Sequence, residues 1–178
     1  QLLLTNSRNL ELILAGGTYD EDHVRALDTE GRTDLQILYN ECGFTDAGHD
    51  ALLDSIQNNR GPTAMICCKI NSRRLAGALR GTRSLNWLSV YNALEMMEEK
   101  EYLETETEFF QAIKENRGLE YLSFIQRFVS DDNWSVLCDS LGKHPTLEWL
   151  NLALLGNIQD TAQKTTRMRS LLKMLQFN

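Results

Sequence analysis

A short hydrophobic pattern recurs along the chain: a leucine, two other residues, a second leucine, one residue, and then an apolar residue. It occurs at residues 85–90, 119–124 and 147–152, and each copy is followed by polar residues and by apolar positions at helical spacing. Alternating apolar residues predict a β-strand, whereas apolar residues at i, i+3, i+4 and i+7 predict an amphipathic helix. The pattern therefore predicts repeated strand–turn–helix units.

Weaker copies extend the series to about six units. The first inward-facing residues of the predicted strands are Leu12, Ile37, Met65, Leu88, Leu122 and Leu150. Their spacing is 23–28 residues, except for the 34 residues between Leu88 and Leu122. This longest interval holds an acidic segment, which we expect to form an irregular insertion over residues 91–104 before a helix resumes near Thr105.

Apolar stripes predict which face of each helix packs on the strands. The stripes are Leu52, Leu53 and Ile56; Leu75, Ala78 and Leu79; Phe109, Phe110 and Ile113; Trp134, Leu137, Cys138 and Leu141; and Met168, Leu171, Leu172 and Leu175. Side-chain oxygens that can accept from the first free backbone N–H groups precede several of these helices. We expect Asp20 to cap a first short helix, Thr45 or Asp46 to cap the second, and Ser130 or Asp131 to cap the fifth.

The recurring strand pattern resembles that of leucine-rich repeats, whose period is about 20–29 residues. Cys42 and Phe44 match the turn of the ribonuclease-inhibitor class, where an Asn or Cys is followed by an apolar residue and a polar helix start. The phrases at 58–62 and 144–148 look like those of long repeat arrays in single-celled algae.

This resemblance covers about residues 9–178. It implies an α/β fold: a right-handed solenoid in the shape of a horseshoe arc, with a parallel β-sheet on the concave face and helices on the convex face. It also implies a single domain over residues 1–178, of about six repeats, that is a fragment of a longer array.

Composition and charge exclude some kinds of partner and favour one kind of compartment. The chain has 178 residues with 18 Lys and Arg against 25 Asp and Glu, a net charge of −7, and it lacks the basic stripe typical of nucleic-acid binding. Its longest apolar runs are too short to cross a bilayer, so we expect no membrane insertion. Cys42, Cys67, Cys68 and Cys138 contain no C-x-x-C pair, which favours free thiols in a reducing intracellular compartment. That compartment is the cytoplasm, or an organelle if a targeting segment precedes this sequence.

Residues that carry catalysis elsewhere are scattered. His23, His49 and His144 lie in separate predicted units, without the spacing of a zinc site. Neither a phosphate-binding glycine loop nor a nucleophile elbow occurs. We therefore expect no metal, no cofactor and no enzymatic activity.

The outward strand positions are the candidate binding residues. In the predicted register, one column holds Glu11, Gln36, Ala64, Trp87, Tyr121 and Trp149, and the next holds Ile13, Leu38, Ile66, Ser89, Ser123 and Asn151. We expect Trp87, Tyr121 and Trp149 to anchor a partner, because aromatic side chains bury a large area at low entropic cost. We expect polar side chains to determine which partner binds, namely Glu11, Gln36, Ser123 and Asn151. The alternative is that the rings stack on one another, or are covered by the acidic loop or by further repeats.

These features predict a non-catalytic protein–protein interaction domain, or scaffold, that binds another protein through its concave strand face. Two alternatives remain open. One is a structural or assembly subunit of a large complex that uses the segment 91–108 for contacts, and the other is the recognition part of a longer enzyme or regulator. The sequence does not specify the partner.

Overall fold

The computed structural model describes residues 10–28, 35–66, 72–91, 99–126, 129–154 and 161–175. Within these residues the chain forms a six-stranded sheet, a two-stranded pair and six helices. The elements in chain order are β1 (Leu10–Ala15), β2 (Thr18–Tyr19), α1 (Glu21–Ala26), β3 (Leu35–Asn40), β4 (Gly43–Phe44), α2 (Asp46–Gln57), β5 (Ala64–Ile66), α3 (Ser72–Gly81), β6 (Trp87–Tyr91), α4 (Glu99–Glu115), β7 (Tyr121–Gln126), α5 (Asp131–Leu141), β8 (Trp149–Leu154) and α6 (Thr161–Leu175).

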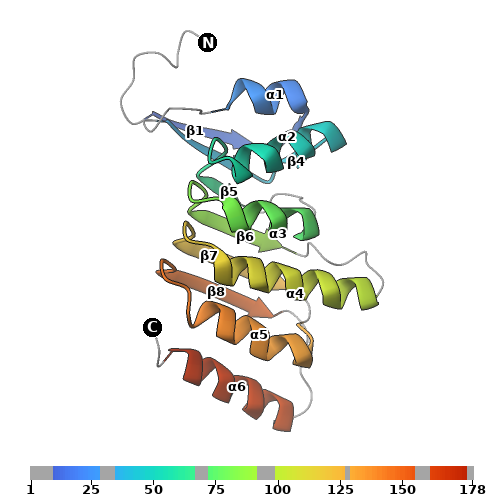
Figure 1. Ribbon diagram of the computed structural model, residues 1–178, viewed down its shortest axis with the longest axis vertical. Helices are drawn as coiled ribbons and strands as arrows, with labels where there is room; N and C mark the ends of the chain where they lie inside the picture. The colour runs from blue at the N-terminus through green and yellow to red at the C-terminus, as the bar shows by residue number, and fades with distance from the viewer. Residues whose placement is uncertain are drawn as a thin grey trace.

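The large sheet follows the order of the chain. Its strands lie in the order β1-β3-β5-β6-β7-β8, every neighbouring pair is parallel, and β2 and β4 form a separate parallel pair. Figure 1 shows the helices stacked beside the strands in the same order, and each helix makes its main helix contacts with the next one along the chain. The expected mixed α/β architecture with a parallel sheet is therefore confirmed.

The core lies between the sheet and the helices. The predicted inward residues Ile37, Met65, Leu88 and Leu122 are at most 1% exposed, and the predicted stripes of α2, α3, α4 and α5 are buried. Phe109 and Phe110 of α4 meet Phe124 of β7, with ring centroids 6.0 and 5.5 Å from the Phe124 ring. Burying a large apolar side chain stabilises a fold by about 1.5–3 kcal/mol, so these residues dominate the core.

The predicted helix caps are confirmed, and for α2 and α5 the structure shows which of the two candidate residues is the cap. Thr45 caps α2 by accepting from the Gly48 N–H at 3.1 Å, and Ser130 caps α5 by accepting from the Asn133 N–H at 3.1 Å. Asp20 caps α1 in the same way. Each cap satisfies a backbone donor that has no partner inside its own helix.

Helix α4 begins at Glu99 and not near Thr105, so part of the expected irregular insertion over 91–104 is helical. An acidic composition does not by itself indicate an irregular loop, because Glu and Lys are good helix formers. Tyr91 is the last residue of β6, and residues 92–98 of that expected insertion lie outside the described residues.

The predicted strand register is wrong at one step. Ile37 was expected beside Met65, but Tyr39 is the residue paired with Met65, a shift of two residues between β3 and β5. A two-residue shift keeps the same side chains facing inward, so the alternation of apolar residues does not distinguish the two registers. Both Ile37 and Tyr39 are buried, which explains why either register satisfies the pattern.

Asn116 connects two successive units. Its side chain is fully buried; Nδ2 donates to the carbonyls of Leu79 (2.6 Å) and Thr82 (3.1 Å). Its Oδ1 accepts from the backbone N–H groups of Gly118 and Leu119, both at 2.8 Å. One amide side chain therefore satisfies the end of α3 and the turn before β7.

Replacing Asn116 with Ala leaves buried carbonyl and N–H groups without partners, which we expect to lower the free energy of unfolding by about 3 kcal/mol. Urea denaturation followed by circular dichroism measures this. The matched control is Asn58→Ala, at an exposed asparagine that ends α2 and bonds Asp54, for which we expect a loss below about 1 kcal/mol. Equal losses in the two variants would contradict the role given to Asn116.

Candidate binding surface

Three aromatic side chains lie on the strand face that points away from the helices. Trp87 of β6 is paired with Tyr121 of β7, which is paired with Trp149 of β8. Leu88 and Leu122, which follow the first two aromatics, are buried in the core, and Leu150, which follows the third, packs against it, so the aromatics face outward. Trp87 is 38% exposed and Trp149 is 44% exposed, which is unusual for side chains of this size. We call Trp87, Tyr121 and Trp149 the aromatic row.

The rings of the aromatic row also contact one another. The centroids of Trp87 and Tyr121 are 5.1 Å apart with planes inclined by 21°, and those of Tyr121 and Trp149 are 6.5 Å apart with planes inclined by 41°. The rings therefore stack on one another, and Trp87 and Trp149 remain exposed at the same time. Contact with its neighbour restricts each ring, so ordering the rings against a partner costs little entropy.

The second outward row differs in what it exposes. Ser89, Ser123 and Asn151 are in register, as expected, but Ser89 and Ser123 are each only 7% exposed. Asn151 is partly exposed, and its Nδ2 donates to the Ser123 Oγ at 3.2 Å. Asn151 therefore offers polar groups beside the aromatic row. The Ser123 side chain is mostly buried, and its Oγ accepts the hydrogen bond from Asn151.

Glu11 and Gln36 do not lie in the aromatic row. They are paired with each other, and both are exposed, but the two-residue shift between β3 and β5 displaces them toward the start of the strands. The row instead continues from Trp87 through Ala64 to Leu38 and then to Ile13, which is 58% exposed. This row is thus apolar from Ile13 to Trp149, and the expected placement of Glu11 and Gln36 beside the aromatics is wrong.

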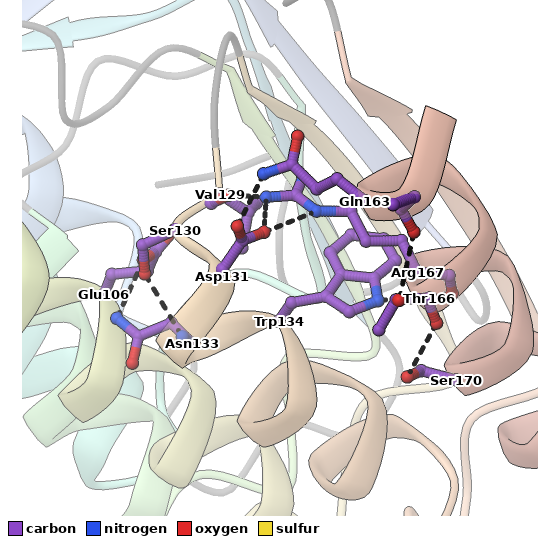
Figure 2. A network of polar contacts seen from close by, with 11 residues as sticks. Glu106, Val129, Ser130, Asp131, Asn133, Trp134, Gln163, Thr166, Arg167 and Ser170 are labelled. Carbon is purple, nitrogen blue, oxygen red and sulfur yellow. Dashed lines mark hydrogen bonds and ion pairs between the residues drawn. The ribbon is translucent and has the colours of Figure 1, made fainter. Parts of the chain in front are cut away.

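A second cluster of polar residues lies at the start of α5. Figure 2 shows Glu106 of α4, whose fully buried carboxylate accepts from the Ser130 Oγ at 3.2 Å and from the Asn133 Nδ2 at 2.8 Å. Asn133 also accepts from the Thr107 Oγ1 at 2.8 Å. This network joins α4 to the first turn of α5, and it gives the buried carboxylate a structural role.

Arg167 joins α6 to α5 at the other side of the same cluster (Figure 2). Its guanidinium donates to the Val129 carbonyl and to the Asp131 carboxylate, each at 2.6 Å from Nη2, and lies 5.0 Å from the centre of the Trp134 ring. The Trp134 Nε1 donates in turn to the Arg167 carbonyl at 3.3 Å. Hydrogen bonds from Arg167, and secondarily from Gln163, hold the pKa of the Asp131 carboxyl below its ordinary value.

Arg167 also determines which side of α6 faces inward. Arg167 and Met174 are the buried residues of this helix, whereas Met168, Leu172 and Leu175 are 56%, 54% and 61% exposed. The stripe expected on the inner face is therefore mostly outside, and only Leu171 of that stripe packs partly against the core. The bonds to Val129 and Asp131 set this rotation of the helix.

A groove of about 390 Å³ lies between α5 and α6. Cys138 and Met174 line it, and burial raises the pKa of the Cys138 thiol to about 11, which keeps it protonated at neutral pH. At its rim, hydrogen bonds from Lys114 and Lys143 lower the pKa of Asp139 to about 2. The groove therefore presents an unreactive thiol and a carboxylate that is already paired.

Among the described residues, no three or more His, Cys, Asp or Glu side chains gather as a metal site, and no described helix is long and apolar enough to cross a membrane. Cys42 is buried as a free thiol, like Cys138, whereas Cys67 and Cys68 lie outside the described residues.

Arg167→Ala removes the bonds that hold α6 against α5. We expect a loss of about 2–4 kcal/mol in the free energy of unfolding, because a buried carbonyl and a charged group lose their donor, and faster amide hydrogen exchange in α6. The control is Arg169→Ala, at an exposed arginine of the same helix, with an expected change within about 0.5 kcal/mol. Hydrogen exchange that rises equally in both variants would contradict this account of α6.

No protein-family model matches the chain, and no curated protein matches its sequence significantly. A function is therefore inferred from the side chains on the outward strand face.

Proposed function

We propose that the chain is a leucine-rich-repeat solenoid that acts as a non-catalytic protein–protein interaction domain. In this proposal the sheet lines the concave side, the helices cover the convex side, and a partner protein binds across the strands. The support for the solenoid is the order of the sheet: strands follow one another in parallel, and a helix on the same side separates each strand from the next (Figure 1). Such arrays present a broad strand face to partners.

The aromatic row is the observation that carries the binding role. It places two exposed tryptophans and a half-buried tyrosine on consecutive strands, already ordered by contact with one another. Tryptophan and tyrosine dominate the energetics of many protein interfaces, because they bury large apolar areas at the centre of the contact. The exposed side chain of Ile13 and the partly exposed Leu38 extend the apolar strip, so a partner would cover several strands at once.

The buried polar groups support the non-catalytic part of the proposal. Glu106 is held by Ser130 and Asn133, and Arg167 is held by Val129 and Asp131. Both networks connect neighbouring helices, so their donors and acceptors are used to hold the fold together. The outward strand face, by contrast, offers large apolar side chains whose burial would drive association.

The test compares two triple variants, each of which truncates three large side chains on one surface. Trp87→Ala, Tyr121→Ala and Trp149→Ala together remove the aromatic row, and Met168→Ala, Leu172→Ala and Leu175→Ala remove three exposed apolar residues of α6. A partner is isolated with the wild-type chain, purified, and its affinity measured by calorimetry. We expect the first variant to bind at least about 100-fold more weakly, since hot-spot aromatics contribute about 2 kcal/mol or more each, and the second to bind as the wild type does.

Circular dichroism establishes that both variants fold. If the triple aromatic variant unfolds, Trp149→Ala alone carries the test, because Trp149 is the most exposed of the three side chains and β8 is at an edge of the described sheet. A folded aromatic variant with wild-type affinity would eliminate the aromatic row as the binding surface.

A further inference from the structure

Glu120 adjoins the aromatic row at the start of β7. Leu119 and Leu122 are both buried although they are three residues apart, so the strict alternation of a strand does not hold between them. The N–H groups of Glu120 and Tyr121 both donate to the Asn86 carbonyl, each at 2.9 Å, as in a strand with one extra residue. The two residues between the leucines therefore both lie outside the core, and the Glu120 side chain is partly exposed.

Glu148 repeats this arrangement at the start of β8. Its N–H and that of Trp149 both donate to the Glu120 carbonyl, at 2.8 and 3.0 Å, and its side chain is exposed. The two glutamates precede Tyr121 and Trp149, which are paired in the sheet, so their backbones lie about 5 Å apart. Like charges side by side on adjacent strands are unfavourable, so the fold gains nothing from this pair of carboxylates.

Neither glutamate is neutralised within the described part of the chain. No ion pair there joins either carboxylate to a basic side chain. The basic residues of the preceding loops are engaged on the helix side. Arg117 donates to the carbonyls of Lys114 and Asn116, and Lys143 pairs with Asp139 of α5.

The sheet itself supplies no positive charge. Within their bounds the six strands of the large sheet contain no Lys, Arg or His, and their one charged residue is Glu11. The outward face therefore combines exposed tryptophans with negative charge. A positively charged partner meets complementary charges on this face, whereas an acidic one meets like charges.

We propose that the partner of the aromatic row presents an arginine-rich segment, whose guanidinium groups lie on the exposed rings and pair with Glu120 and Glu148. This inference rests on the binding role proposed above for the row. A guanidinium is planar, lies within about 6 Å of an aromatic ring centre, and can donate two parallel hydrogen bonds to a carboxylate. The chain contains one such combination already: Arg167 lies 5.0 Å from the centre of the Trp134 ring and bonds the Asp131 carboxylate.

The probes are three fluorescein-labelled synthetic peptides of equal length, with arginine, lysine or glutamate at every second position and glycine or serine between. Fluorescence anisotropy measures their binding to the full chain. We expect the arginine peptide to bind, and the lysine peptide to bind at least about threefold more weakly, because an ammonium group is a hydrated point charge that does not stack on a ring. The glutamate peptide is expected not to bind. Absence of binding by the arginine peptide, or equal affinity for any two of the peptides, would overturn the proposal.

Two double variants test the glutamates. The row variant is Glu120→Gln with Glu148→Gln, and the control is Asp22→Asn with Glu115→Gln, at exposed carboxylates of α1 and α4. Both change the net charge by the same amount. We expect the row variant to bind the arginine peptide at least about tenfold more weakly, because charge-assisted hydrogen bonds are lost, and the control to change by less than about twofold. Equal losses would mean that net charge alone attracts the peptide, which contradicts the site.

Charge reversal adds a gain of binding. Glu120→Lys with Glu148→Lys is expected to bind the glutamate peptide and to lose the arginine peptide, and circular dichroism establishes that it folds. If it does not fold, the row variant carries the test, since glutamine keeps the size of glutamate. A folded reversed variant that still prefers the arginine peptide would contradict the proposal.

The purified partner separates this proposal from the binding role of the aromatic row. If the triple aromatic variant loses affinity for the partner but Glu120→Gln with Glu148→Gln does not, the row binds the partner and the arginine contact is wrong. Loss of affinity in both variants supports both proposals. Wild-type affinity in both variants eliminates both.

Discussion

A strand followed by one helix cannot cover both sides of its own apolar surface, and this constraint organises the structure. Each inward strand residue is buried only because strands and helices lie on both sides of it, as for Leu88 and Leu122 in the middle of the sheet. Polar side chains reinforce the same junctions. Asn116 connects α3 to the turn before β7, and Arg167 connects α6 to the start of α5. In the proposed solenoid, stability would be close to a sum of contacts between neighbours.

The same constraint leaves one face of the sheet free for function. Because the helices take the inner side chains, the outer ones are released from any role in the core, and Trp87, Tyr121 and Trp149 meet as neighbours there. Parallel strands lie about 5 Å apart, which suits stacking between rings on adjacent strands. The row is therefore a product of the register of β6, β7 and β8, which three copies of one sequence pattern set.

Periodicity was sufficient to predict the parts of the fold that depend on local pattern. The buried stripes of α2 to α5, the caps Thr45 and Ser130, and the register of the aromatic row follow from apolar spacing and from turn chemistry. The shift between β3 and β5 did not follow, because a slip of two residues preserves which side chains face inward. That slip is what separates Glu11 and Gln36 from the aromatics. The rotation of α6 did not follow either, since it depends on a bond between Arg167 and Asp131, residues 36 apart in sequence.

We propose that the aromatic row is open in the free chain and becomes covered when a partner protein binds. Acrylamide quenching of tryptophan fluorescence tests this directly in a Trp134→Phe background, which removes the tryptophan that is only 4% exposed and leaves Trp87 and Trp149 as reporters. The account predicts strong quenching of the free chain and protection of both reporters when the partner binds. Reporters that are already protected in the free chain, or that are quenched equally in the complex, would contradict it.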